Sequence, residues 1–449
     1  MDEREVNFEE RVRALIEAKD LSALGTLLGD LPPQEIEQFL EGLENEQRKQ
    51  VLDILNPEIA AEVFGGLDEV VQEEVADLLS EREIANLVEE MESDEAADTV
   101  RLLEPEEQNR VLDLLEDDTE EEVRQLLQHE EDTAGDLMMA ELAAIHEDAL
   151  VAEAIEYLRE RQDEIRELYN VYLVDSNRKL VGSLSLRDMV LARPGMPLKA
   201  FMDPDPVSAT PDLDQEEVAQ LFRKYDLVSL PVVDDAGVLV GRITVDDIID
   251  VIEEETIEDL SRFAGMSELS FRPGRIFRVS RARLPWLLLG LLGGLLSGRI
   301  LQGFEIALTQ VVELAFFVPV IMALAGNIGI QSSTLVVRGL ATGEIRETET
   351  RRLILREAGV SLINGMVIML VSFLAVWLWM GQPVLGGIVA LSMLSVVLWA
   401  TLTGTLVPII FKRLGQDPAF ATGPFVTTTN DIVALTIYML IAWRLRAFL

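Results

Sequence analysis

The chain has 449 residues and a formal net charge of −43, which excludes several classes of function before any motif is considered. The charge alone argues against nucleic acid as a partner, because a polyanion would be repelled by so acidic a protein. The absence of cysteine excludes thiolate nucleophiles, disulfide bonds, cysteine-ligated zinc and iron–sulfur clusters. The two histidines, His129 and His146, leave little material for a histidine-based catalytic site.

Almost all the acidic residues lie in the first part of the chain. Residues 271–449 carry 8 acidic and 15 basic side chains, a net charge of +7, which leaves −50 for residues 1–270. A charge of this size repels itself unless salt or bound cations screen it, so cations are the first ligands to consider. Solvated acidic faces, as in a protein from a salty environment, would also explain part of the excess, since the chain has 6 Lys against 31 Arg.

Residues 31–127 repeat with a period of 24. The chain begins MDEREVNFEERVRALIEAKD, which lacks the apolar core of a secretory signal, so we expect about the first 280 residues to stay in the cytosol. Each repeat predicts two short amphipathic helices, with Asn56 as an N-cap and Pro57 at the first helical position. Because such units bury their apolar faces only by stacking, residues 1–130 are predicted to form an all-α superhelical domain.

A second repeat, with a period of 59, occupies residues 131–252. YLVDSNRKLVGSLSLRDMV (172–190) matches LPVVDDAGVLVGRITVDDII (230–249). Each copy predicts two short strands around a polar turn, followed by a Ser/Thr-x-x-Asp sequence that enters a helix. This α/β arrangement resembles a tandem cystathionine-β-synthase (CBS) pair, a regulatory module that often binds adenine nucleotides.

The Ser/Thr-x-x-Asp sequences have two interpretations. The resemblance implies a nucleotide site with ATP as the ligand. In it Asp188 holds a ribose hydroxyl, and Ser185 and Arg187 lie near the phosphates. Alternatively, Ser185 and Thr244 are simple N-caps, and the acids that follow are favoured by the helix dipole. In the second copy, Asp246 and Asp247 suit a cation better than a phosphate. The residues assigned to the nucleotide site are Gly135, Ser185, Arg187 and Asp188.

A dense acidic helix is predicted where the second repeat ends. Residues 247–259 read DIIDVIEEETIED, and a connecting helix is expected over residues 253–280. Like charges three and four residues apart destabilise an isolated helix by about 0.2–0.5 kcal/mol per pair. Divalent cations would remove this repulsion, because carboxylate oxygens are the hard ligands that Mg²⁺ and Ca²⁺ require. A solvated connector is the alternative.

Residues 281–449 are predicted to form a five-helix transmembrane domain. Apolar stretches near 284–303, 311–337, 358–380, 384–411 and 424–445 each reach the ~20 residues that span a bilayer. Five arginines between Arg272 and Arg283 place the N-terminal half in the cytoplasm by the positive-inside rule. Arg444 and Arg446, at the outer end of the last stretch, go against that rule.

Two membrane segments carry polar residues that suggest a pore. Asp431 lies in the last span, where a buried unpaired carboxylate costs about 2.5–3.5 kcal/mol, so it is expected to face a pore. In the second span, Pro319, Gly326 and Gly329 are expected to loosen the helix beside amide and hydroxyl oxygens. Glycine and serine also suit close helix contact without a pore.

With these parts in this order, the chain resembles the MgtE family of magnesium channels. The resemblance rests on AGNIGIQSS in the second span, GQDPAFATGPFVTTTND before Asp431, and YDLVSLPVVDDAGVLVGRITVDDIIDVIEEE in the second CBS copy. It implies a homodimer in the cell (inner) membrane that imports Mg²⁺ through a pore on the two-fold axis and closes when cytosolic Mg²⁺ bridges acidic residues. The implied pore residues are Asp431, Gly423, Thr427, Asn327 and Gln331. The implied regulatory metal ligands are Glu62, Asp94, Asp98, Asp226, Asp247, Asp250, Glu255, Glu258 and Asp259.

Several departures and alternatives bear on this interpretation. Ile330, Gly423 and Ala434 stand where some relatives have an amide, an asparagine and a glycine, which leaves the preference for Mg²⁺ over Co²⁺, Ni²⁺ or Mn²⁺ open. A membrane-anchored CBS-type sensor without a pore is the main alternative, and an anion channel is disfavoured by Asp431. An enzyme finds no support, because the chain lacks a phosphate-binding glycine-rich loop and a histidine near an acid pair.

Overall fold

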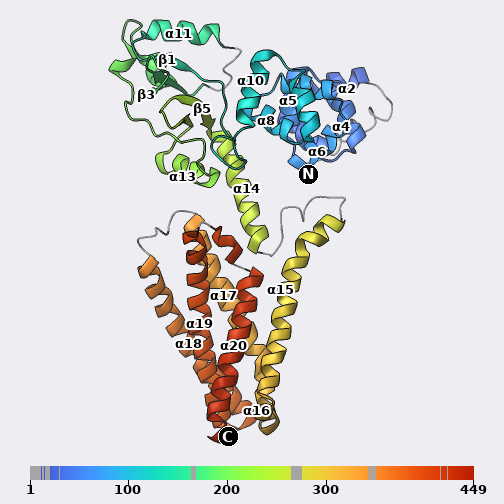
Figure 1. Ribbon diagram of the computed structural model, residues 1–449, viewed down its shortest axis with the longest axis vertical. Helices are drawn as coiled ribbons and strands as arrows, with labels where there is room; N and C mark the ends of the chain where they lie inside the picture. The colour runs from blue at the N-terminus through green and yellow to red at the C-terminus, as the bar shows by residue number, and fades with distance from the viewer. Residues whose placement is uncertain are drawn as a thin grey trace. The chain divides into compact units, whose positions relative to one another are not determined.

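The protein divides into two compact units, Met1–Ile252 and Glu253–Leu449, which we describe separately (Figure 1). Among the described residues, the first unit contains short helices and two small sheets, and the second contains helices without strands. These elements confirm the predicted combination of an all-α superhelical domain, an α/β tandem module and a five-helix apolar domain. The computed structural model describes residues 12, 15, 21–29, 31–162, 168–263, 276–341, 345, 350–414, 416–421 and 423–448.

The superhelical domain repeats two short helices every 24 residues, as predicted. Helices α5 (Pro57–Gly65), α7 (Glu81–Val88) and α9 (Pro105–Leu112) start 24 residues apart, and each contacts the next. Proline at the first helical position fits because its missing N–H would have no intrahelical partner there. The predicted N-cap Asn56 precedes α5 but makes no side-chain capping hydrogen bond. The other helices among the described residues of this domain are α2 (Leu21–Leu28), α3 (Pro33–Glu41), α4 (Asn45–Leu52), α6 (Glu69–Ala76), α8 (Ser93–Arg101) and α10 (Asp117–Leu126).

The second repeat forms two antiparallel hairpins. Strand β2 (Asn170–Val174) pairs with β3 (Leu180–Ser185), and β4 (Ser229–Val233) pairs with β5 (Leu239–Thr244). The register shift falls at equivalent positions in both hairpins, 59 residues apart, which confirms the predicted period. The other elements are β1 (Ala144–His146), which pairs in parallel with β2, α11 (Val151–Glu160), α12 (Leu186–Leu191), the 3₁₀ helix η1 (Leu198–Ala200), α13 (Gln215–Tyr225) and α14 (Val245–Phe263).

The two hairpins contact each other through backbone and side chain. Leu180 N donates to Gly237 O at 3.0 Å, and Leu239 N donates to Arg178 O at 3.1 Å. The buried hydroxyls of Tyr172 and Ser229 lie 2.5 Å apart. Burial raises the pKa of Tyr172 to about 12, so this phenol stays neutral and can share a hydrogen bond with the serine. The two copies are therefore one packed module.

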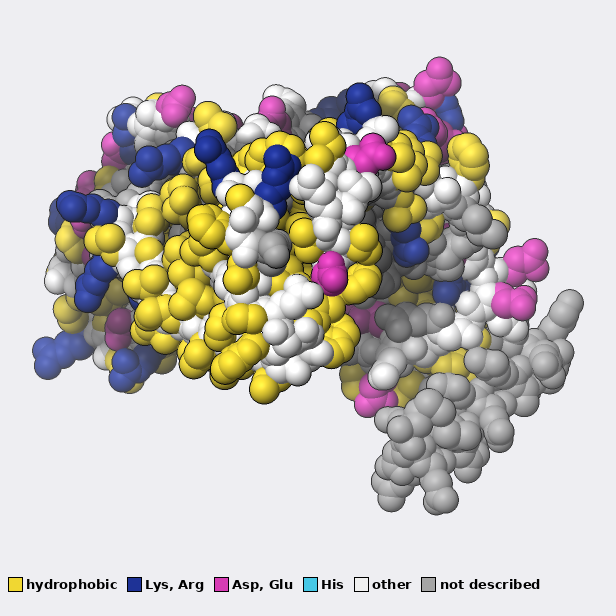
Figure 2. Space-filling model, turned by 90° about the horizontal axis from the view of Figure 1, so that it is seen from below, with side chains coloured by type: hydrophobic (Ala, Val, Ile, Leu, Met, Phe, Trp, Pro, Cys, Tyr) yellow, Lys and Arg dark blue, Asp and Glu magenta, His cyan; other side chains and the backbone are white. Residues whose placement is uncertain are grey.

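In the part of the second unit that the structure describes, five helices are long and apolar enough to cross a membrane. Helix α19 packs against α17, α18 and α20, and α15 packs against α20. Large hydrophobic side chains are exposed on α15 and α18, as lipid contact would require, and hydrophobic side chains fill much of the view in Figure 2. The five helices are α15 (Ile276–Gly303), α17 (Val318–Ala341), α18 (Thr350–Met380), α19 (Pro383–Arg413) and α20 (Gly423–Leu445).

The second span differs from the prediction of a helix loosened at its glycines. The short helix α16 (Glu305–Gln310) and the 3₁₀ helix η3 (Val312–Phe317) precede it, and α17 then runs without interruption from Val318. Pro319 lies in the first turn of α17, where a proline costs no intrahelical hydrogen bond. Gly326 and Gly329 lie inside the continuous helix, so their role is in packing.

Replacing Phe64 with alanine should destabilise the first unit by about 3–5 kcal/mol, because this fully buried ring fills the superhelical core. The matched control is Leu114→Ala, in the same domain but 49% exposed, which should change the free energy of unfolding by less than about 0.5 kcal/mol. Urea unfolding followed by circular dichroism measures both variants. Similar losses for the two would contradict this assignment of the core.

Candidate functional site

Asp431 lies inside α20 with one carboxylate oxygen covered by protein. The residue is half-buried, and Oδ1 receives no hydrogen bond from any described residue. A covered polar atom normally has a partner, because an unsatisfied one costs about 1–3 kcal/mol and a charged one costs more. The predicted carboxylate is therefore present at membrane depth without a basic partner in the described part of the chain.

A glycine on α17 brings the backbone close to this carboxylate. A Cβ atom added at Gly326 would lie 3.7 Å from Asp431 Oδ1 and 3.1 Å from Thr427 Cγ2. The Thr427 hydroxyl donates to Gly423 O one turn earlier at 2.9 Å, so three of the predicted pore residues lie along one segment of α20. Small residues allow such close approach of membrane helices.

The neighbouring Asn430 joins three helices. It is fully buried in α20, and its Oδ1 accepts a hydrogen bond from Thr403 Oγ1 of α19 at 2.6 Å. On the other side it packs against Gly329 of α17, where any Cβ would overlap the amide. Gly404 likewise allows close packing, because a Cβ there would lie 2.6 Å from Gly329 O. These contacts fix the rotation of α20 and thus the direction of Asp431.

Sequence reasoning did not assign a role to Asn430 or Thr403. The available signal was the pair Thr403-Gly404 in an otherwise apolar span, together with the amide directly before the intramembrane acid. A polar residue such as Asn430 needs a hydrogen-bond partner at membrane depth. The sequence does not show that Thr403 is this partner, because the contact depends on how α19 packs against α20.

The two predicted amide ligands lie on a different face of α17. Asn327 and Gln331 are exposed, and with Thr334 and Arg338 they follow the spacing of one helix face. Successive residues are rotated by about 100° in an α-helix, so Asn327 lies that far around α17 from Gly326. Within one chain, the amides therefore do not converge on Asp431. Exposed amides at membrane depth need protein or water beside them.

A second candidate site joins the superhelical domain to the second CBS-like copy. Asp94 on α8 is 7% exposed, and its Oδ1 has no hydrogen-bond partner among the described residues. Burial, and next the charge of Asp247, raise the pKa of Asp94 well above its usual value. Burial also raises the pKa of Asp247, at the start of α14, to about 7, although hydrogen bonds from Thr244 oppose the shift. Carboxylates from two domains therefore repel each other here.

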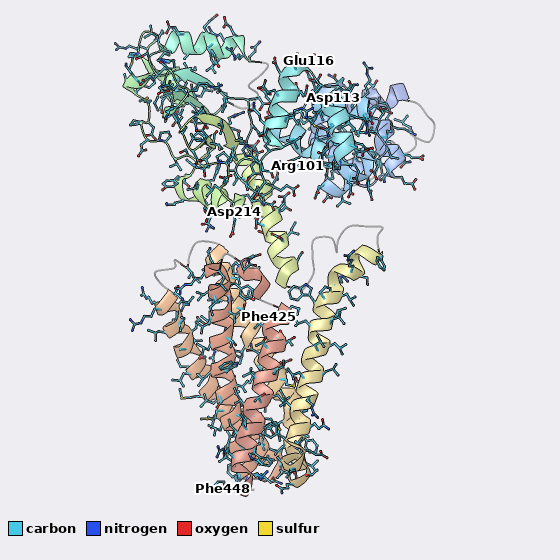
Figure 3. The ribbon with its side chains drawn as sticks, in the orientation of Figure 1. Arg101, Asp113, Glu116, Asp214, Phe425 and Phe448 are labelled. Carbon is cyan, nitrogen blue, oxygen red and sulfur yellow. The ribbon has the colours of Figure 1, made fainter. Side chains whose placement is uncertain are left out.

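Hydrogen bonds beside Asp94 hold α8 against the CBS-like module. The backbone N–H and hydroxyl of Ser93 donate to the Glu141 carboxylate at 3.1 and 2.7 Å, and Ala140 N donates to Ser93 Oγ at 2.8 Å. Arg101, the last residue of α8 and labelled in Figure 3, forms an ion pair with Asp136. The position of Asp94 is therefore set by contacts on both sides.

Two of the other predicted regulatory acids lie about one helical turn from this pair: Asp98 follows Asp94 on α8, and Asp250 follows Asp247 on α14. Glu62, Asp98, Asp226 and Asp250 are exposed, and Asp98 forms a 3.0 Å ion pair with Arg101. Glu255 and Glu258 lie further along α14, and the Asp259 side chain and residues 264–275 lie outside the described part of the chain. No group of three histidine, aspartate or glutamate side chains in the described part is arranged to hold a metal.

The proposed nucleotide residues have the geometry of helix caps. Ser185 Oγ donates to Asp188 Oδ2 at 2.8 Å and accepts from Asp188 N at 3.1 Å. Thr244 and Asp247 repeat the hydroxyl contact at 2.8 Å in the second copy. Arg187 is exposed, and Gly135 packs against the His129 ring. The capping interpretation is therefore satisfied, and nucleotide binding stays a prediction.

Comparisons with known proteins agree with this organisation. A family profile described as a divalent cation transporter matches residues 318–441, one described as the MgtE intracellular N domain matches 31–132, and the CBS domain profile matches 134–195 and 198–254. Over 318 residues the chain is 40% identical to the magnesium transporter MgtE of Thermus thermophilus, a match that covers 70% of each chain. Identity to the magnesium transporter MgtE of Bacillus subtilis is 39%, covering 69% of each chain.

One solved structure also resembles the first unit. The cytosolic domain of the Mg²⁺ channel MgtE in complex with ATP aligns with a TM-score of 0.52 and 36% identity. The alignment covers 54% of this chain and 99% of that chain. The family profiles therefore give the order of the domains, and the solved structure agrees with the fold of the part that precedes the membrane helices.

Gly329→Ala should lower the free energy of unfolding of the purified protein by about 1–3 kcal/mol, and with it the melting temperature, because the new methyl group would overlap Asn430. Gly294→Ala is the matched control, since a Cβ at this membrane-helix glycine meets nothing within 4 Å. The control should be neutral or stabilising by about 0.4–1 kcal/mol. Equal melting temperatures for the two variants would show that the contact between α17 and α20 is looser than described.

Without divalent cations, the first unit should lose stability as the pH rises from about 4 to about 7. Raised pKa values mean that the folded state binds more protons than the unfolded state in this window, so the free energy of unfolding falls with pH. Asp94→Asn should flatten the fall, and Asp77→Asn, at an exposed position of the same domain, should not. Denaturant unfolding at a series of pH values measures the free energy of unfolding of both variants. If it falls equally steeply with pH in Asp94→Asn and Asp77→Asn, the interaction between Asp94 and Asp247 is ruled out.

Proposed function

Because the chain belongs to the MgtE family of magnesium transporters, we propose that it is a Mg²⁺ channel or importer that Asp431 makes selective and that cytosolic acidic residues gate. The relatives are named as transporters, a class without enzymatic activity. The observation that carries the proposal is the covered Asp431 oxygen that lacks a hydrogen-bond partner among the described residues. A passing cation supplies the charge that this oxygen needs.

The ion would be recognised largely through its water shell. Mg²⁺ sheds its octahedral waters reluctantly, and it usually keeps several of them when it binds carboxylates. One carboxylate beside the hydroxyl of Thr427 and the carbonyl of Gly423 can accept hydrogen bonds from those waters. Selection would then depend on the size and charge of the hydrated ion. Gly423 offers no side-chain ligand, so flux measurements with Co²⁺, Ni²⁺ and Mn²⁺ must define the preference.

The pore would lie between two copies of the chain. The exposed stripe of Asn327, Gln331, Thr334 and Arg338 is unsuited to lipid and requires a protein or aqueous neighbour. In a symmetric dimer the same stripe from each copy faces the axis, since a two-fold interface is made by the same surface twice. The stripe and Asp431 would then border one water-filled path, with one carboxylate from each subunit.

Cytosolic Mg²⁺ would close the pore by binding between domains. An ion between Asp94 and Asp247 would neutralise the Asp247 charge that, after burial, raises the pKa of Asp94. It would also offset the burial that raises the pKa of Asp247. Asp247 is in the first turn of α14, which also carries Glu255 and Glu258 and runs from the first unit into the second. Closure of the pore requires only that the acidic domains bind the ions more tightly when they are held together than when they are apart.

ATP is a second candidate ligand of the CBS pair. The related cytosolic domain was solved with ATP, and Ser185, Arg187 and Asp188 are the residues of this chain that we assign to such a site. Binding would require Asp188 to exchange its contact with Ser185 for a ribose hydroxyl. A membrane-anchored sensor without a pore remains the competing function, and it assigns no task to Asp431.

Asp431→Asn should abolish Mg²⁺ uptake into vesicles that contain the purified protein, because the amide keeps the shape but removes the charge. The same variant should keep the Mg²⁺-dependent protection of the first unit from protease. Asp247→Asn is the reciprocal control: it should weaken protection and leave the open pore conductive. Uptake by Asp431→Asn equal to that of the unmodified protein would exclude the selectivity role and favour the sensor.

A further inference from the structure

Arg446, directly after α20, carries a charge that the described part of the protein does not neutralise. Its Nη1 atom is covered and has no hydrogen-bond partner among the described residues. The guanidinium carbon lies 3.3 Å from the centre of the Trp443 ring, and that ring meets Phe304 edge-on with centroids 6.3 Å apart. Stacking therefore fixes the guanidinium while its hydration is partly removed.

The acidic residues at this end of the unit do not compensate the charge. Glu305 begins α16 and Glu313 lies in η3, between the first and second spans, and neither forms an ion pair with a described basic residue. The dipole of α20 favours a cation at its C-terminal end by about 0.3–1 kcal/mol. This effect explains a basic residue here, but it leaves the guanidinium charge without a counter-anion among the described residues.

The place of Arg446 in the chain indicates what could neutralise it. The fifth candidate span runs from Gly423 to Phe448, so Arg446 lies at its boundary, where tryptophan side chains and lipid headgroups meet. Five spans put this boundary on the side opposite the cytosolic domains, where the positive-inside rule does not favour arginine. The lipid phosphate is an anion present at that depth.

We propose that Arg446, held by Trp443, binds the phosphodiester of an anionic phospholipid at the outer face of the membrane. A guanidinium matches phosphate oxygens with two parallel hydrogen bonds, and one flat face remains free to stack on an aromatic ring. Nη1 is covered, so the phosphate approaches the rest of the group, which is partly exposed. A headgroup without its own ammonium is preferred, because it has no internal cation to compete with the arginine.

The test is native mass spectrometry of the full-length protein, purified in detergent and mixed with phosphatidylglycerol or phosphatidylcholine. The unmodified protein should retain phosphatidylglycerol more strongly than phosphatidylcholine. Arg446→Gln should weaken the retention of phosphatidylglycerol about tenfold or more. Arg444→Gln is the matched control, because it removes an equal charge at an exposed position of the same helix end and leaves the stacked guanidinium in place. It should retain most of the lipid.

Two further arms keep the result unambiguous. Arg446→Lys keeps the charge but not the paired hydrogen bonds, so it should weaken retention even if Arg446→Gln fails to fold. Glycerol phosphate, added in excess, should not displace the lipid, since the acyl chains contribute to binding. Equal losses in Arg444→Gln and Arg446→Gln, full retention by Arg446→Lys, or displacement by glycerol phosphate would each overturn the proposal.

Discussion

A carboxylate oxygen that is covered by protein and receives no hydrogen bond needs a proton or a cation beside it, and this constraint acts in both units. In the second unit it applies to Asp431 Oδ1, and in the first unit to Asp94 Oδ1. Neither oxygen is close to a described basic residue that could pair with it in the way that Arg101 pairs with Asp136. The same chemistry therefore recurs at the proposed transport site and at a site where domains meet.

The two sites differ in what holds the carboxylate in place. Around Asp431 the helices approach closely because Gly326, Gly329 and Gly404 present no side chain, and Asn430 fills the remaining space. This arrangement is rigid, because a packed core resists small displacements. Around Asp94 the contact is made by a few hydrogen bonds between Ser93, Glu141 and the neighbouring backbone. A contact of this kind can be opened by repulsion and closed by an ion.

Helix α14 gives the first site a path to the second unit. It begins at the Thr244–Asp247 cap, continues past the boundary between the units, and is acidic over much of its length. A helix that is unfavourable in isolation because of like charges becomes favourable when cations bind beside it. The proposed gate therefore needs no structural element other than α14. The free energy of closing would come from Mg²⁺ binding, set against the repulsion between the carboxylates.

Local patterns in the sequence determined much of this protein. The 24-residue repeat predicted pairs of short helices, the 59-residue repeat predicted two equivalent hairpins, and the apolar stretches predicted five spans. Each of these depends on neighbours within about one helical turn or one hairpin, so the order of residues is sufficient. The significance of Asp431 was also predictable, because its chemistry conflicts with its apolar surroundings.

Only the tertiary structure decided which distant residues meet. It brought Asn430 to Thr403 and Gly329, placed Asp247 close enough to repel Asp94, and left Asn327 and Gln331 exposed on another face of α17. It also showed that α17 is continuous at the glycines that were expected to loosen it. These outcomes depend on how several helices pack together, and the rotation of a helix by a fraction of a turn changes its contacts without changing its own sequence pattern.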